Sequence, residues 1–237
     1  MIGFLRTIFA VAVLVLVVPL AALVAFPWTF ISGKIDFLYW VGMGLTHFGV
    51  RLAGVKIKLV GLDKLDPKGT YIFMSNHVSN LDPPILAPMI PGLVSFLAKK
   101  EVWRIPILAQ ALTLAEFVPV ERGNRDAAIQ SIQRAGEVMR HGINVTLFPE
   151  GTRSPDGRLL PFKKGPFHLA AETGFPIVPV TILGTYEMMP KGSSVTKSGT
   201  ATLVFHPPID PKQFAEREDL VQAVRDAVNS ALPEERQ

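Results

Sequence analysis

The sequence predicts an α/β fold in which helices flank a mixed, largely parallel sheet, preceded by an N-terminal hydrophobic membrane-binding helical segment. From residue 55 onward, short apolar runs typical of buried strands alternate with stretches of helical periodicity, which is the order found in α/β domains. Before that point the chain is almost purely apolar. We therefore assign residues 1–54 to a membrane-anchoring segment and residues 55–237 to an α/β domain.

The N-terminal segment has no charged residue between Arg6 and Lys34, and at 1.5 Å per residue such a run could cross about 30 Å of hydrocarbon. Three interpretations compete: a cleaved signal peptide, a single transmembrane anchor, and a membrane-embedded pair of helices with breaks at Pro19, Pro27 or Gly33. The run is long for a signal peptide and no clean small-x-small cleavage site ends it. A second apolar stretch follows and carries a Tyr-Trp pair suited to a membrane interface. Membrane attachment is the conclusion, and the choice between anchor and helical pair stays open.

The net charge and the absence of cysteine limit the kinds of partner and site that the chain can have. The net charge of +4 suits an anionic partner such as lipid headgroups, phosphates or nucleic acid. The chain has no cysteine, which excludes disulfides, cysteine-based zinc sites and a cysteine nucleophile, and which fits a reducing compartment.

Seven strands and five helices are expected in the α/β domain. The first strand, residues 55–61, alternates apolar and basic residues as a half-exposed strand would. The other expected strands are 71–75, 93–98, 117–120, 144–148, 177–183 and 201–205. The expected helices are 84–90, 105–114, a helix from Asn124 or Asp126 to a C-terminal cap at Gly142, 167–173 and 220–232.

Polar clusters follow the ends of four of these strands, at 76–82, 99–101, 121–123 and 149–154. The carboxyl ends of parallel strands gather along one crevice of an open α/β sheet, so these clusters can converge although they lie far apart in the sequence. Guanidinium groups such as those of Arg122 and Arg153 suit a phosphate, because their planar fork donates two hydrogen bonds at once. Backbone N–H groups around Gly151 and Thr152 could add donors for a phosphate or a developing oxyanion.

One cluster contains a histidine and a carboxylate that could act together. His77 follows the expected strand 71–75, and Asp82 comes five residues later, across a turn that is closed by Pro83 and Pro84. An imidazole oriented by a carboxylate can serve as a general base. His-x4-Asp also occurs by chance in many chains, so the prediction depends on the clusters around it.

These residues resemble motifs of the glycerolipid acyltransferases of the 1-acylglycerol-3-phosphate acyltransferase type. The similar motifs, in the order and spacing of that family, are NHVSNLD at 76–82, VPVERG at 118–123, FPEGTRS at 148–154 and IVPV at 177–180. The resemblance covers about residues 70–185, and the first and third motifs together make it specific. One departure is Glu121, which precedes Arg122 where the family often has Asp; this difference is conservative.

The resemblance implies acyl transfer from a thioester, acyl-CoA or acyl-carrier protein, to the sn-2 hydroxyl of 1-acylglycerol 3-phosphate, which gives phosphatidic acid (EC 2.3.1.51 type). It implies that His77 takes the hydroxyl proton as general base and that Asp82 orients the imidazole. The substrate-binding residues that it implies are Arg122, Glu150, Gly151, Thr152, Arg153 and Lys100. No covalent acyl-enzyme is needed, in agreement with the absence of cysteine and of a Gly-x-Ser-x-Gly elbow. A membrane-associated enzyme without a cofactor is expected, with its catalytic domain on the cytoplasmic face, at the cell inner membrane if the source is bacterial.

Two alternatives keep the same pocket. The acceptor could be a different lysolipid or an ornithine-type lipid, or the protein could be a non-catalytic lipid-binding membrane protein, against which the intact His77, Asp82 and Arg153 argue. No metal site is expected, because no second histidine or carboxylate lies at ligand spacing to His77. Nucleic-acid binding is not expected, because a basic helix and a set of stacking aromatic residues are both lacking.

Two basic features have local interpretations as well. Arg153 could pair with a nearby carboxylate such as Asp156 instead of a substrate. Lys163 and Lys164 follow Phe162 and are typical of a solvated basic turn, with a contact to a headgroup or a carrier protein as the alternative.

Overall fold

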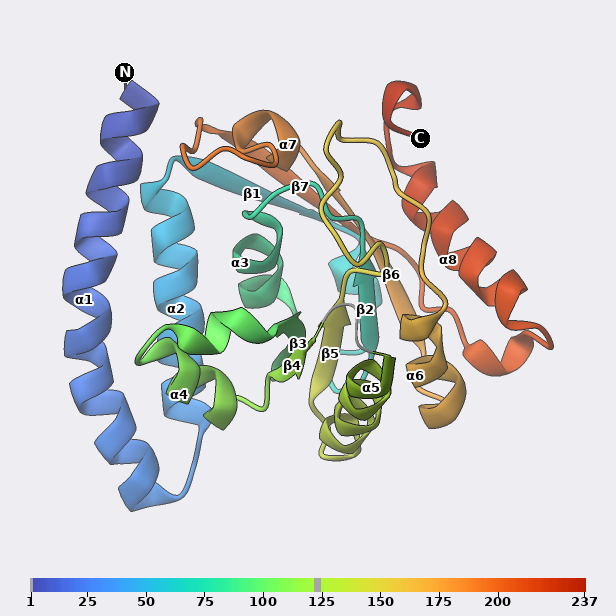
Figure 1. The fold of residues 1–237 in the computed structure, drawn as a ribbon, viewed down its shortest axis with the longest axis horizontal. Coiled ribbons are helices and arrows are strands. Elements are labelled where there is room, and N and C mark those ends of the chain that lie inside the picture. Colours follow the sequence, from blue (N-terminus) through green and yellow to red (C-terminus); the bar gives the residue numbers. More distant parts are fainter. Residues whose placement is uncertain (1, 122–124) are drawn as a thin grey trace.

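A computed structural model describes residues 2–121 and 125–237 of the protein (Figure 1). Its centre is a seven-stranded sheet of order β1-β7-β6-β2-β5-β3-β4. The strands are β1 (Val55–Val60), β2 (Ile72–Ser75), β3 (Val94–Lys99), β4 (Val118–Val120), β5 (Asn144–Leu147), β6 (Ile177–Leu183) and β7 (Gly199–Phe205). Strands β6, β2, β5, β3 and β4 run parallel to one another, β7 is antiparallel to β6, and β1 is parallel to β7. The mixed, largely parallel sheet is therefore confirmed, and each expected strand lies within two residues of its predicted bounds.

Helices cover both faces of this sheet, because its central strands are apolar on both sides. In β2 the side chain of Phe73 belongs to the core on one face, whereas Ile72 and Met74 belong to the core on the other, as the two-residue period of a strand requires. The helices of the domain are α3 (Asp82–Leu86), α4 (Leu108–Leu114), α5 (Arg125–Arg140), α6 (Gly165–Thr173), α7 (Thr185–Met188) and α8 (Arg217–Ser230). Helices α2 and α3 pack on the Phe73 side, and α5, α6 and α8 pack on the other. Helix α7, which was not predicted, carries the chain from β6 towards a loop beside α3.

The N-terminal segment forms two antiparallel helices, α1 (Ile2–Ser32) and α2 (Asp36–Leu52), which lie side by side in Figure 1. The helical pair is thus the arrangement seen, but α1 continues through Pro19 and Pro27, and the expected break occurs only at Gly33, whose φ is +66°. The helices pack closely, since a Cβ at Gly49 would lie 2.8 Å from a methyl carbon of Leu14.

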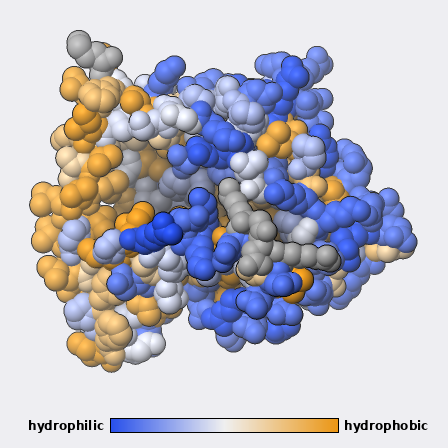
Figure 2. Space-filling view, viewed as in Figure 1, coloured by the Kyte–Doolittle hydropathy of each residue, from blue (hydrophilic) through white to orange (hydrophobic). Residues whose placement is uncertain are grey.

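The outer side of α1 is strongly apolar. Side chains such as Leu16, Leu23 and Ile31 are 67%, 72% and 83% exposed, and this surface forms the continuous hydrophobic band over α1 in Figure 2. In the described part of the chain, α1 is the one helix long and apolar enough to cross a membrane. An uncovered apolar surface of this size indicates membrane association.

The start of α1 is also attached to the α/β domain. The Arg6 guanidinium donates to the Thr196 carbonyl at 3.2 Å, and the Thr196 N–H donates to the Thr7 hydroxyl at 3.0 Å. At the other end of the pair, α2 leads through Gly54 directly into β1. The turn end of the helical pair is attached to the domain as well, because the Tyr39 hydroxyl in α2 accepts from the Val94 N–H at 2.8 Å.

Candidate active site

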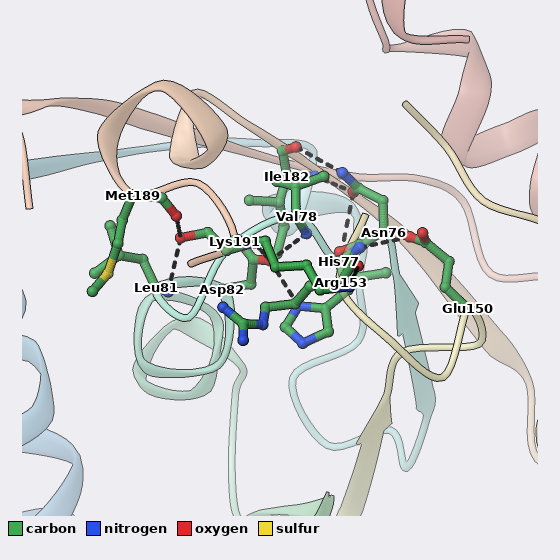
Figure 3. Close-up of polar contacts among 12 residues, drawn as sticks. Asn76, His77, Val78, Leu81, Asp82, Glu150, Arg153, Ile182, Met189 and Lys191 are labelled. Atoms are coloured by element: carbon green, nitrogen blue, oxygen red, sulfur yellow. Dashed lines mark hydrogen bonds and ion pairs between the residues drawn. The ribbon is translucent and has the colours of Figure 1, made fainter. Parts of the chain in front are cut away.

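His77 and Asp82 form a hydrogen-bonded pair at the carboxyl end of β2. The imidazole Nδ1 lies 2.8 Å from Asp82 Oδ2, and Asp82 is the first residue of α3 and has no exposed surface (Figure 3). Because an ionised carboxylate can only accept, Nδ1 carries the proton and Nε2 is left as the basic nitrogen. Nε2 has no hydrogen bond to any described residue, and 11% of the imidazole side chain stays exposed.

The turn between the two residues closes around the Asp82 carboxylate. Oδ2 also accepts hydrogen bonds from the backbone N–H groups of Val78 at 2.8 Å and Ser79 at 2.7 Å. The other oxygen, Oδ1, is buried without a hydrogen-bond partner among the described residues. A second proton on the imidazole would therefore be stabilised by the negative charge of a carboxylate that has hydrogen bonds at only one of its two oxygens.

Two side chains that the sequence interpretation passed over fasten this turn to the rest of the sheet. The Asn76 amide accepts from the Ile182 N–H at 2.7 Å and donates to the Ile182 carbonyl at 3.0 Å, which joins the end of β2 to β6. The Ser79 hydroxyl donates to the Met189 carbonyl at 2.7 Å, just beyond α7. Asn76 and Ser79 lie within the first motif, but their inward orientation is visible only in the structure.

Glu150 points into the protein. Its Oε1 accepts from the His77 N–H at 2.7 Å, its Oε2 accepts from the Leu160 N–H at 3.1 Å, and only 2% of the residue is exposed. Burial raises the pKa of Glu150 to about 8, against the lowering effect of these two hydrogen bonds. The sequence places Glu150 among the substrate-binding residues, whereas in the structure its carboxylate binds the backbone N–H of His77 and so holds the loop 148–154 against the end of β2.

Phe148 was not predicted as a site residue, yet it covers one face of the imidazole. The two rings stack with centroids 4.1 Å apart and an interplanar angle of 18°. Phe96 packs behind Phe148 at 6.5 Å. The stacked ring restricts the imidazole to the orientation that Asp82 selects.

The loop after β5 brings the third motif next to His77. The Ser154 N–H donates to the His77 carbonyl at 2.8 Å, and Lys191 donates from its ammonium to the Arg153 carbonyl at 2.9 Å (Figure 3). Asp156 accepts from the Ser154 hydroxyl and the Arg158 N–H, and no described carboxylate forms an ion pair with Arg153. The interpretation of Arg153 as a partner of Asp156 is therefore wrong.

The backbone donors expected in this loop differ in availability. The Gly151 N–H is already hydrogen-bonded to the Phe148 carbonyl at 3.0 Å, so it cannot serve an oxyanion without breaking that turn. Within the described part of the chain, the Thr152 N–H has no hydrogen-bond partner. Thr152 is thus the donor left free in the pair that the sequence indicated.

Lys100 lies at an outer strand of the same edge. Lys100 follows β3, is largely exposed, and pairs with Glu121 after β4 at 3.1 Å. Arg122 lies outside the described residues. The four clusters follow β2, β5, β3 and β4, which are neighbours in the sheet and run parallel, so their expected convergence on one edge is confirmed for the described residues.

A cavity of about 470 Å³ lies at this edge, between the ends of β3, β4 and β5 and the helices α5 and α6. Its lining is mainly apolar and includes Leu97, Ile132, Leu147, Phe148, Gly151 and Lys163. Because Phe148 both lines the cavity and stacks on the imidazole, a ligand in the cavity would approach the His77–Asp82 pair along that ring.

Comparisons with known proteins agree with this geometry. The family model described as Acyltransferase matches residues 56–183. A 1-acyl-sn-glycerol-3-phosphate acyltransferase from Limnanthes douglasii is 35% identical over 210 residues, which cover 87% of this chain and 73% of that protein. The chain belongs to the 1-acyl-sn-glycerol-3-phosphate acyltransferase family. A member of this acyltransferase family from Borreliella burgdorferi is 32% identical over 183 residues, which cover 76% of the chain and 73% of that protein.

A solved acyltransferase structure has the same fold. The crystal structure of the 1-acyl-sn-glycerophosphate (LPA) acyltransferase PlsC from Thermotoga maritima matches with a TM-score of 0.83 at 27% identity, and the match covers 97% of this chain and 92% of that one. Because the match spans nearly the whole chain, it includes the two N-terminal helices as well as the acyltransferase sheet.

Proposed function

We propose that His77 is the general base and Asp82 the orienting carboxylate of an acyl transfer to the sn-2 hydroxyl of 1-acylglycerol 3-phosphate, which yields phosphatidic acid. The relatives and the solved structure are named for this activity, and their names support the acceptor. The observation that carries the residue roles is the 2.8 Å contact between Nδ1 and Oδ2, because it leaves Nε2 unprotonated and without a described partner.

His77, next to Asp82, accounts for both proton transfers of the reaction. Nε2 of His77 takes the proton from the acceptor hydroxyl while its oxygen forms a bond to the thioester carbonyl carbon. In the resulting imidazolium the positive charge lies next to the buried Asp82 carboxylate. When the carbon–sulfur bond breaks, the imidazolium returns the proton to the departing sulfur, so that the products are the ester and a free thiol. The Thr152 N–H is the donor we assign to the negatively charged carbonyl oxygen.

Cations at the same edge would hold the acceptor phosphate. Arg153 follows Thr152 directly and forms no ion pair with a described carboxylate, so its guanidinium is free to bind two phosphate oxygens. Arg122 of the second motif and Lys100 after β3 are the further phosphate ligands that we assign. Glu150 and Gly151 would contribute by shaping the loop that presents Arg153.

The membrane and the two substrates fit the same arrangement. The acceptor is a membrane lipid and the donor is a water-soluble acyl-CoA or acyl-carrier protein, so the reaction requires a site at the bilayer surface. The apolar band on α1 supports this placement. We assign the catalytic domain to the cytoplasmic face, the inner membrane if the source is bacterial. Protease protection of the loop between α1 and α2 in oriented vesicles tests this assignment.

The decisive experiment uses purified protein, 1-acylglycerol 3-phosphate and an acyl-CoA. Wild type should form phosphatidic acid, and His77→Ala should lose at least about 100-fold in kcat, the lower end expected for a general base. His141→Ala, which changes an exposed histidine after α5, should keep full activity. Activity that survives in His77→Ala would refute the mechanism, and activity confined to acceptors without a phosphate would refute the substrate.

A further inference from the structure

Lys163 lies across the loop that carries the third motif. Its backbone N–H donates to the Pro149 carbonyl at 2.9 Å, and its side chain passes over Gly151. A Cβ at Gly151 would lie 2.8 Å from the Lys163 Nζ and 2.9 Å from its Cε. Glycine at this position, with φ of +70°, therefore leaves the space through which the ammonium reaches the cavity.

The neighbouring lysines are paired, and Lys163 is not. Lys164 pairs with Glu218, Lys99 pairs with Glu101, and Lys100 pairs with Glu121. No described residue forms an ion pair or side-chain hydrogen bond with the Lys163 ammonium, and every aspartate and glutamate of the chain falls within the described residues. Both lysines are exposed, as expected for a solvated basic turn, but only Lys164 is paired, and the Lys163 ammonium is left at the rim of the cavity.

The unpaired ammonium borders an apolar cavity beside the catalytic pair. The same cavity of about 470 Å³ is lined by Lys163, Gly151 and Phe148, and Phe148 stacks on His77 at 4.1 Å. Lys163 is exposed, so water screens its ammonium on the outer side, whereas the apolar wall weakens that screening on the cavity side. The ligand that fits is one with an apolar part for the cavity and an anionic group for its rim.

We infer that Lys163 is a phosphate-binding residue, which contacts a phosphate of a substrate whose apolar part enters this cavity. The inference rests on the proposed function. Two phosphates have the required chemistry: the phosphomonoester of the acceptor and the phosphate of the phosphopantetheine arm of the donor. An ammonium acts as a point charge without the two-pronged geometry of arginine, so either phosphate can be bound.

Lys163→Met tests the inference, since it keeps the apolar stem and removes the charge. Lys163→Arg restores the charge, and Lys164→Met is the matched control that removes the neighbouring charge. KM and kcat are measured with acceptor and donor varied in turn. For Lys163→Met we expect a rise of about tenfold in the KM of one substrate, with kcat within about twofold of wild type. Lys163→Arg should recover most of this loss, and Lys164→Met should show none.

Substrates without phosphate identify which phosphate is bound. If the acceptor phosphate is the ligand, the effect of Lys163→Met disappears with a monoacylglycerol acceptor. If the donor phosphate is the ligand, it disappears with an acyl-N-acetylcysteamine thioester. Unchanged KM values for both substrates, or a loss confined to kcat, would overturn the inference while the proposed function stands.

A direct binding measurement separates the inference from the reaction. Calorimetric titration of the full chain in detergent with glycerol 3-phosphate and with 4′-phosphopantetheine should show binding of one of them that weakens about tenfold in Lys163→Met. Absence of acyl transfer in wild type would refute the proposed function, and the titration would still decide the role of Lys163. Equal binding by wild type and Lys163→Met would overturn it.

Discussion

The charge of Asp82 can be removed with little change of shape, and the structure predicts how the enzyme should respond. In Asp82→Asn the amide oxygen can occupy the position of Oδ2 and accept the same three hydrogen bonds, from His77 Nδ1 and from the Val78 and Ser79 N–H groups. The opposite orientation would point an NH2 group at two backbone N–H donors, which excludes it. The variant should therefore keep the turn and the imidazole tautomer and lose the negative charge.

The size of the effect follows from the distance between the charges. Nδ1 and Oδ2 lie 2.8 Å apart, which places the centres of the imidazolium and carboxylate charges about 4 Å apart. At an effective dielectric constant of about 20 this attraction amounts to about 4 kcal/mol. Since about 1.4 kcal/mol corresponds to a factor of ten in rate, kcat should fall about 1,000-fold. Asp82 is fully buried, so the KM of the acceptor should stay within about twofold.

A cost in stability should accompany the loss of activity. The new NH2 group takes the place of Oδ1, which has no partner among the described residues, and a buried unpaired donor costs about 1–3 kcal/mol. This cost should lower the unfolding temperature without contributing to the change in kcat at temperatures where the variant is folded.

Release of free thiol from acyl-CoA provides the assay, because the chain has no cysteine that would react with a thiol reagent. Asp66→Asn is the control for removal of a carboxylate, since the exposed Asp66 likewise accepts from a backbone N–H, that of Lys68. A folded Asp82→Asn that retains more than about a tenth of the wild-type kcat would refute the electrostatic argument. A change confined to KM would refute it as well.

Three further perturbations have defined outcomes. Burial raises the pKa of Glu150 to about 8 from an ordinary value of 4.5, so between these pH values the folded protein retains a proton that the unfolded chain has released. The free energy of unfolding should therefore fall as pH rises from about 4.5 to about 8, by up to about 1.4 kcal/mol per pH unit. Thermal unfolding between about pH 5 and pH 9 should show this slope in wild type and in the exposed control Glu187→Gln but not in Glu150→Gln, and parallel curves for all three would contradict it. Asn76→Ala should lower the free energy of unfolding by roughly 2–4 kcal/mol, because it leaves a buried N–H and carbonyl of Ile182 unpaired; a loss under 1 kcal/mol in chemical denaturation would count against that. Arg153→Lys should raise the KM for 1-acylglycerol 3-phosphate about tenfold and leave the KM for acyl-CoA unchanged, and steady-state kinetics that show the reverse would place Arg153 at the donor.

The central strands β2, β5 and β6 were predictable from the sequence because they are buried on both faces. A continuous apolar run such as residues 177–183 lacks the polar face that a surface helix would have, so it indicates a buried strand. The structure confirms its bounds as β6. The break of the N-terminal segment was less predictable. Proline lacks an N–H donor and clashes with the preceding turn, so it can either kink a helix or end it, and the sequence does not decide between the two. Helix α1 continues through Pro19 and Pro27 and ends before Gly33, which adopts a positive φ.

The composition of the site was predictable, but the direction of its side chains was not. His77 and Asp82 were paired from their spacing across a turn, which limits where the two side chains can meet. Glu150 and Arg153 are three residues apart in one loop, and nothing in their order indicates that the first turns inward to the His77 backbone while the second stays unpaired. Lys163 lies ten residues beyond Arg153, and only the fold brings it over Gly151.

Two groups of polar atoms can be distinguished at this edge of the sheet by their partners. The Asn76 amide, the Ser79 hydroxyl and the Glu150 carboxylate are all engaged by backbone groups of other segments, so together they fix the His77 turn from several sides. The Arg153 guanidinium and the Lys163 ammonium have no such partner among the described residues. In the proposed reaction the cations would order the substrate through its phosphate, while the hydroxyl would meet a nitrogen that is already held in its reactive tautomer. The fixed groups should therefore affect stability and kcat together when they are changed, whereas the unpaired cations should affect KM alone.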